Sequence, residues 1–235
     1  MASIYVVRHG QASFGEENYD KLSTLGCRQA EVLGEYFRDC GIHFDATFSG
    51  DLQRQRKTAK LAIASQPGSD NHTIDARFNE LNNEEQYEAL GPDIIANNPV
   101  LKAMVDGGLS SSKDYQKVLK HIFNRWVSPD CPASNIQSWS DYRDGVWAAL
   151  NEIIQQQGSG KTIGLFTSGG TIATIMAQVL GLSSEHVYNF YEPVINCSVT
   201  QLFYSGDRVS LSYYNDHSYL KVLGTQRGEQ LVTYR

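Results

Sequence analysis

A cation and an imidazole stand side by side where the first apolar run of the chain ends. Residues 4–13 read IYVVRHGQAS, so Arg8 and His9 follow directly on the apolar residues, and Gly10 leaves space beside the ring. A neutral imidazole is a competent nucleophile when its second ring nitrogen is held by a hydrogen-bond partner. Attack by the imidazole on phosphorus would form a phosphohistidine and divide phosphoryl transfer into two easier steps. His9 is therefore a candidate nucleophile.

Two arginines and a glutamate could supply the other groups that this chemistry needs. Phosphoryl transfer places negative charge on the equatorial oxygens, and a guanidinium fork binds two of these oxygens at once. Arg8 is one candidate for this role. Arg54 is the other, because it falls in the first turn of a predicted helix, where the helix dipole also favours an anion. Glu80, in the loop RFNELN after a predicted strand, is a candidate general acid, with Glu84 and Glu85 as rivals by position.

The candidates lie at the carboxyl ends of predicted strands. Residue patterns predict strands at 3–8, 45–50 and 161–168, and a further strand from 72 towards 81. They predict helices at 24–38, 51–65, 138–157 and 169–181. A hairpin is predicted at 196–216, with its turn at 205–207. Alternating strands and helices are typical of a parallel sheet flanked by helices, which binds ligands beyond the carboxyl ends of its strands. We therefore expect these polar residues to converge on one crevice.

This pattern predicts an α/β fold with an open, mostly parallel sheet and helices on both faces. The length of 235 residues suits a single domain, residues 1–235. Residues 83–135 differ from the rest, because loops rich in Gly, Pro and Ser alternate with short helices. We expect this segment to form a helical, lid-like insertion over the active site.

Charge and composition exclude several classes of protein. The net charge is −6, whereas nucleic-acid-binding domains carry a basic face, so we expect no nucleic-acid partner. The four cysteines have neither CxxC spacing nor neighbouring histidine ligands, which predicts reduced thiols, a cytoplasmic location and no metal site.

Residues 162–184 are uncharged and long enough to span a bilayer. Their polar residues and Gly-Gly pair predict a buried strand, turn and helix instead, and hence no membrane partner.

Four stretches resemble the histidine phosphatase superfamily, the group that includes cofactor-dependent phosphoglycerate mutase. VVRHGQAS resembles the family signature, and YDKLSTLGCRQAEVLG (19–34) resembles its segment joining the first strand and helix. FSGDLQRQRKTA (48–59) resembles the second signature, and RFNELN the stretch that carries the acid glutamate. The resemblance covers most of residues 4–82 and continues more weakly to about residue 217.

The resemblance implies specific roles for the candidate residues. His9 would be the phosphorylated nucleophile, Arg8 and Arg54 would bind the phosphoryl group, and Glu80 would donate the proton. It also implies a phosphoglycerate mutase-like three-layer sandwich that uses no metal ion or other cofactor. The partner would be a small phosphorylated substrate, and homo-oligomers are compatible with the sequence.

One position departs from the family pattern. The family usually has a second histidine in the turn after the later strand, whereas FTSGGTI places Ser168 there, followed by Gly169. We expect both residues to contact the phosphoryl group, but a serine hydroxyl brings no positive charge. Loss of one such donor costs about 2.7–4 kcal/mol of transition-state stabilisation, or about a hundredfold to a thousandfold in rate.

The function that fits best is a phosphomonoester hydrolase that acts through a phosphohistidine on a small phosphorylated metabolite. A mutase needs a strongly cationic pocket, and the predicted insertion carries few cations, namely Lys102, Lys113, Lys117, Lys120 and Arg125. The alternatives within the family are a weak or inactive phospholigand-binding protein and a phosphoglycerate mutase-type phosphotransferase.

A serine hydrolase is a remote alternative. Ser168 stands between a strand and a helix, and Asp216 and His217 follow in the chain order of an α/β-hydrolase triad. However, Phe166 occupies the position where the nucleophile elbow requires glycine. Dinucleotide binding is disfavoured because the glycine fingerprint is absent after the first strand.

Overall fold

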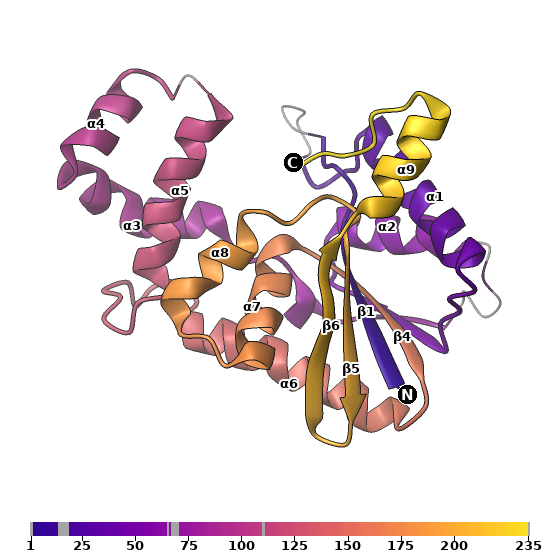
Figure 1. The fold of residues 1–235 in the computed structure, drawn as a ribbon. Coiled ribbons are helices and arrows are strands. Elements are labelled where there is room, and N and C mark those ends of the chain that lie inside the picture. Colours follow the sequence, from indigo (N-terminus) through magenta and orange to yellow (C-terminus); the bar gives the residue numbers. More distant parts are fainter. Residues whose placement is uncertain (1, 14–18, 65, 67–70, 110, 235) are drawn as a thin grey trace.

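A six-stranded sheet with helices on both faces forms the fold (Figure 1). The computed structural model describes residues 2–13, 19–64, 66, 71–109 and 111–234. The sheet order is β3-β2-β4-β1-β5-β6. The strands are β1 (Ala2–Arg8), β2 (Ala46–Ser49), β3 (His72–Ile74), β4 (Thr162–Thr167), β5 (Val199–Ser205) and β6 (Arg208–Asp216). The first four strands in this order pair in parallel, whereas β5 and β6 are antiparallel, which confirms the predicted α/β sheet.

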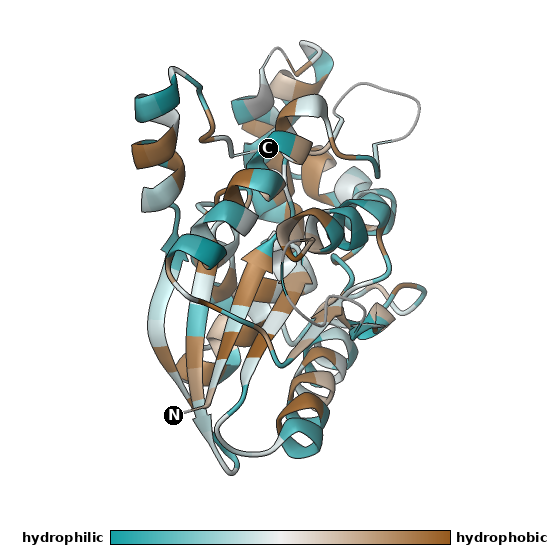
Figure 2. Cartoon of the chain, turned by 90° about the vertical axis from the view of Figure 1, so that its right-hand side faces the viewer, coloured by the Kyte–Doolittle hydropathy of each residue, from teal (hydrophilic) through white to brown (hydrophobic). Residues whose placement is uncertain are grey.

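The two faces of the sheet bury different helices because side chains alternate along each strand. On one face, Val7 and Phe166 pack with α1 (Thr24–Asp39), α2 (Gln53–Ala62) and α9 (Ser218–Arg227). On the other face, Val6 and Leu165 pack with α6 (Trp139–Gln157) and α7 (Gly169–Leu180). In Figure 2 the central strands carry mostly hydrophobic residues, and the surrounding helices carry bands of both hydrophobic and hydrophilic residues.

The segment 83–135 contains α3 (Asn83–Ala96), α4 (Pro99–Asp106) and α5 (Ser112–Trp126). These helices stand beside α8 (Val187–Tyr191) in Figure 1. Their buried residues Leu90, Val118, Ile122 and Phe123 belong to the same hydrophobic cluster as Val6 of β1. The segment therefore shares its core with the sheet. That the chain is a single domain, and that this segment closes over the active site, stay predictions.

Local sequence signals explain most of the element boundaries. Ser23 and Ser138 cap α1 and α6 by accepting hydrogen bonds from Gly26 N–H and Asp141 N–H at 3.0 and 3.1 Å. The predicted strand from residue 72 ends early, because Asp75 caps a 3₁₀ turn, η1 (Ala76–Phe78). A second 3₁₀ turn, η2 (Ser184–His186), precedes α8. The predicted hairpin is confirmed as β5 and β6, with a turn at residues 206–207.

The uncharged segment 162–184 forms the buried strand β4 and the helix α7, as predicted. Within the described ranges, no helix has the length and hydropathy needed to cross a membrane. The four cysteines are free thiols. The helix α9 was not predicted from the sequence.

Two glycines allow the turn after β1 to pack directly on the first turn of α1. A Cβ atom added at Gly26 would lie 2.1 Å from the Gln11 carbonyl oxygen, and one added at Gly10 would lie 2.4 Å from the Gly26 carbonyl oxygen. Both neighbours are backbone atoms, so neither can move aside independently. This contact fixes the segment that carries His9.

We predict that Gly26→Ala destabilises the protein although it places a better helix former in α1. Overpacking should lower the free energy of unfolding by about 1–3 kcal/mol. The matched control is Gly145→Ala in α6, where an added Cβ meets no atom within 4 Å. This control should raise the free energy by about 0.5–1 kcal/mol, because alanine is the better helix former. Urea unfolding measures both, and equal effects of the two substitutions would contradict the close approach.

Candidate active site

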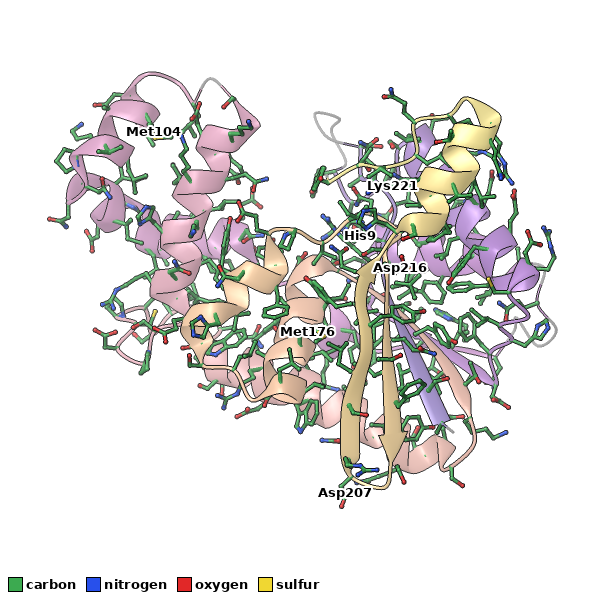
Figure 3. All side chains as sticks on the ribbon, in the orientation of Figure 1. His9, Met104, Met176, Asp207, Asp216 and Lys221 are labelled. Carbon is green, nitrogen blue, oxygen red and sulfur yellow. The ribbon has the colours of Figure 1, made fainter. Side chains whose placement is uncertain are left out.

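The site lies where the carboxyl ends of β1 and β4 meet. Arg8 pairs with Thr167 in the parallel register, and His9 N–H donates to the Thr167 carbonyl at 2.8 Å. This pairing places His9 beside Ser168, which follows β4. Figure 3 shows His9 at the end of the sheet opposite Asp207, which lies in the β5–β6 turn.

His9 is buried, with 3% of its surface exposed, and both ring nitrogens have partners. Its Nδ1 lies 2.7 Å from the Gly10 carbonyl oxygen, and because this oxygen only accepts, Nδ1 must carry the proton. Its Nε2 accepts a hydrogen bond from Arg54 Nε at 3.1 Å. Burial, together with the charges of Arg54 and Arg8, holds the pKa of His9 well below its ordinary value. The ring is therefore neutral, with its lone pair on Nε2, as a nucleophile requires.

Arg54 reaches His9 from the first turn of α2 and is 7% exposed. In addition to the bond from Nε to His9, its Nη1 donates to Asp20 Oδ1 at 2.8 Å. The ring centre of Tyr19 lies 5.5 Å from its guanidinium carbon. Thr58 fixes the helix against the β1 turn, because its hydroxyl donates to the Arg54 carbonyl and accepts from Gly10 N–H.

Arg8 is half-buried and lies beside the start of α7. Its Nη1 donates to the carbonyl oxygens of Val194 and Tyr234. A Cβ added at Gly169 would lie 3.8 Å from Arg8 Nε and 3.1 Å from the Tyr191 ring, so only glycine leaves Tyr191 in place. The structure thus brings Arg8, Arg54 and Gly169 together around His9.

Glu80 approaches the same turn from the loop after η1. Its Oε1 accepts from Gly170 N–H at 2.9 Å and from Leu81 N–H at 3.3 Å. Burial raises the pKa of Glu80, while the charges of Arg54 and Arg8 act in the opposite direction. An added Cβ at Gly170 would lie 2.3 Å from Oε1, so glycine is required for this contact. The raised pKa favours the protonated form that a general acid needs.

The rival carboxylates are placed differently. Glu84 and Glu85 lie in the first turn of α3, and both are exposed. Glu80, in contrast, contacts Gly170 at the start of α7, beside the other candidate residues. Geometry therefore favours Glu80 among the three.

The loop that carries Glu80 is held by buried hydroxyl groups. Tyr142 of α6 lies with its hydroxyl 2.9 Å from the Asn79 carbonyl oxygen and 2.9 Å from Thr171 Oγ1. Thr167 Oγ1 donates to the Phe78 carbonyl at 2.6 Å. Burial and the nearby Glu80 raise the pKa of Tyr142 well above its ordinary value, so it stays a donor.

Ser168 is fully buried, and its hydroxyl is held from α2 rather than capping α7. Gln55 Nε2 donates to Ser168 Oγ at 2.8 Å and also to the Phe78 carbonyl at 3.1 Å. Since Ser168 Oγ accepts in this bond, its own proton is available for another acceptor. Gly169, the first residue of α7, adds a backbone N–H that has no partner within the helix.

The described contacts do not assemble a serine hydrolase triad. Ser168 contacts Gln55, whereas His217 Nδ1 lies 2.8 Å from the Asn215 carbonyl oxygen. Asp216 accepts from Ser218 N–H at the start of α9. In the part of the chain that the structure describes, no three His, Cys, Asp or Glu side chains are grouped as metal ligands would be.

Four residues around the site were not predicted: Asp20, Gln55, Tyr142 and Asn196. Asp20 and Gln55 lie inside the stretches that resemble the family, so a local signal was present. Asn196 donates from Nδ2 to the His9 carbonyl at 3.2 Å across a separation of 187 residues. Contacts of this range leave no mark on local sequence pattern.

Comparison with known proteins identifies one matching family model and several relatives. A family model described as "Histidine phosphatase superfamily (branch 1)" matches residues 4–106 and 107–217. A 2,3-bisphosphoglycerate-dependent phosphoglycerate mutase of Allorhizobium ampelinum is 25% identical over 192 residues, which cover 79% of this chain and 82% of that protein. Broad-specificity phosphatase YOR283W of Saccharomyces cerevisiae is 38% identical over 69 residues, which cover only 26% of this chain and 29% of that protein.

A solved structure supports the fold. The chain is similar to a phosphoserine phosphatase mutant from Entamoeba histolytica in complex with phosphoserine, with a TM-score of 0.67. The similarity covers 94% of this chain and 100% of that one, at 18% sequence identity. At this identity, the likeness concerns the fold alone.

Proposed function

The chain belongs to the histidine phosphatase superfamily, and on this premise we propose that it is a phosphomonoester hydrolase that acts on a small phosphorylated metabolite through a phosphohistidine at His9. The observation that carries this proposal is the buried, neutral imidazole whose Nε2 faces Arg54, with Arg8 close by. A nucleophile with its lone pair directed at a cationic group is poised for an anionic electrophile.

In the first step, phosphoryl oxygens bind Arg8 and Arg54, and the Arg54 Nε–H turns from His9 to an oxygen of the substrate. The freed lone pair of Nε2 attacks phosphorus, and the bond from phosphorus to the leaving oxygen breaks. Glu80 gives its proton to that oxygen, so the leaving group departs as a neutral alcohol. The products of this step are a phosphohistidine and an ionised Glu80.

In the second step, a water molecule attacks the phosphohistidine. Ionised Glu80 takes a proton from this water, the water oxygen bonds to phosphorus, and the P–N bond breaks. Inorganic phosphate is released, and both His9 and Glu80 return to their starting states. Ser168 O–H and Gly169 N–H are placed to donate to phosphoryl oxygens during both steps.

The positions of the cations support a phosphatase over a mutase. Four of the five cations predicted in the insertion are engaged locally: Lys102 with Asp106, Lys117 with Asp114, Arg125 with Asp130, and Lys120 over the Tyr188 ring. The fifth, Lys113, is exposed. The charges that act on the pKa of His9 and Glu80 are those of Arg8 and Arg54. Among the residues that the structure describes, the site therefore lacks the dense cationic lining that a retained, reorienting bisphosphate intermediate would need.

A weak or inactive phospholigand-binding protein is the second candidate. Ser168 favours it, because a buried, uncharged hydroxyl replaces a group that would carry positive charge. Measured turnover separates the two candidates. Cytoplasmic location and homo-oligomer formation stay predictions.

The test of the proposed function is chemical trapping on His9. Wild-type protein mixed with 4-nitrophenyl phosphate and quenched should carry an acid-labile, base-stable phosphate on the peptide that contains His9. His9→Asn should lose this label and lower turnover on the order of a thousandfold or more, because the nucleophile is gone. His72→Asn is the control, since His72 bonds to Thr47 and Ser49 at the sheet edge. Turnover that survives His9→Asn, or a label on Ser168, would overturn the mechanism.

We predict that Glu80→Gln slows the first turnover according to the leaving group. The rate should fall about 10²–10⁴-fold for phenyl phosphate, whose leaving group needs the proton. It should fall far less for 4-nitrophenyl phosphate, whose leaving group departs as a stable anion. Rapid-quench kinetics measure both rates, with Glu84→Gln as the control.

The pH dependence of the same step has a defined sign. Glu80 must be protonated to act as the acid, so the first-turnover rate for phenyl phosphate falls as pH rises through the raised pKa of Glu80. This limb should disappear in Glu80→Gln. A limb that persists unchanged in the variant would assign the acid to another group.

A further inference from the structure

We propose that Asp20 is a positioning residue that holds the Arg54 guanidinium with one edge turned towards His9. The inference rests on the proposed function, in which Arg54 binds the phosphoryl group. Asp20 forms an ion pair with this arginine although both the carboxylate and the phosphoryl group are anionic.

Asp20 is fixed by two donors from the same helix. Its Oδ2 accepts from Gln53 N–H at 2.7 Å, and its Oδ1 accepts from Arg54 Nη1 at 2.8 Å. Gln53 is the first residue of α2, so its N–H has no partner within the helix and points out of the helix start. Both carboxylate oxygens are thus tied to α2, although the Asp20 side chain is still 27% exposed.

The stereochemistry of the guanidinium separates the Asp20 contact from the His9 contact. In arginine, Nη1 lies on the side of Cδ, whereas Nε–H and Nη2 share the opposite edge. Asp20 binds Nη1, and the Nε–H donates to His9 Nε2 at 3.1 Å. A phosphoryl group can therefore bind the Nε/Nη2 edge as a fork while Asp20 keeps hold of Nη1.

A second contact from the same segment restrains the face of the group. The Tyr19 ring centre lies 5.5 Å from the guanidinium carbon of Arg54, within the range of a cation–π contact. Residues 19 and 20 together restrain Arg54 from its face and from one edge. Such restraint lowers the entropic cost of ordering a long side chain when substrate binds.

A competing interpretation makes the opposite prediction. If Asp20 merely occupied the phosphoryl position in the absence of ligand, its removal would free Arg54 and tighten anion binding. If it orients Arg54, its removal weakens anion binding although a negative charge has been lost near the site. The sign of the change in phosphate affinity separates the two interpretations.

The experiment compares wild-type protein with Asp20→Asn. In wild-type protein a different carboxylate oxygen faces each donor, Oδ2 facing Gln53 N–H and Oδ1 facing Arg54 Nη1. In asparagine the NH2 group, which only donates, replaces one of these oxygens, so one of the two hydrogen bonds is lost. We expect inorganic phosphate, titrated by calorimetry, to bind about tenfold more weakly, the effect of one lost bond to a charged group. kcat/KM for 4-nitrophenyl phosphate should fall by at least as much. The melting temperature should stay close to that of the wild type, and Asp20→Glu should recover part of the affinity.

The matched control is Asp51→Asn. Asp51 lies two residues before α2 and also forms an ion pair with an arginine, but its partner Arg56 is exposed, and the N···O distance is 3.3 Å. This control removes the same charge and should leave phosphate affinity within twofold of wild type. If the wild type is active and Asp20→Asn binds phosphate as tightly as the wild type or more tightly, the role proposed for Asp20 is wrong, whereas the proposed function stands. A wild type that neither binds phosphate nor turns over substrate would overturn the proposed function as well.

Discussion

A guanidinium group donating to a buried imidazole is the interaction on which the site depends. Arg54 Nε–H meets His9 Nε2 at 3.1 Å in a place where the imidazole is nearly inaccessible to solvent. A positive charge at this distance in a desolvated site opposes protonation of the ring, while the Gly10 carbonyl fixes the remaining proton on Nδ1. The sheet positions both groups, because His9 follows β1 and Arg54 lies on α2, which follows β2, and β4 lies between these two parallel strands.

The same two arginines act on a nucleophile and an acid that both lie in a desolvated site. Burial favours the neutral form of both His9 and Glu80, but neutral means deprotonated for the imidazole and protonated for the carboxyl group. The charges of the two arginines also favour the neutral form of His9, whereas they favour the ionised form of Glu80. For Glu80, burial has the larger effect, so its pKa is raised. Pairs of titratable groups driven to complementary protonation states are typical of acid–base catalysis. The protein thus prepares a nucleophile with a free lone pair and a carboxyl group that carries a proton.

Local pattern predicted the parts of the fold that are locally determined. The strand before His9 and the helices capped by Ser23 and Ser138 follow from residue types that act within a few positions. The helix α9 escaped prediction because Gly224 lies in its interior, which lowers helix propensity. Glycine is needed there because an added Cβ would lie 2.6 Å from the carbonyl oxygen of Glu229, just beyond the end of the helix. In the site, Asp20 contacts Arg54, 34 residues away, and Gln55 contacts Ser168, 113 residues away. Only the fold brings these pairs together.

The most direct test of His9 as the phosphoryl acceptor is a crystal structure of the protein with orthovanadate. We predict vanadium bonded to His9 Nε2, vanadate oxygens bound by Arg8 and by the Nε/Nη2 edge of Arg54, and an Arg54 Nε–H that no longer donates to the imidazole. Vanadate bonded to Ser168 Oγ, or held away from His9 with the Arg54–His9 hydrogen bond intact, would contradict the central claim.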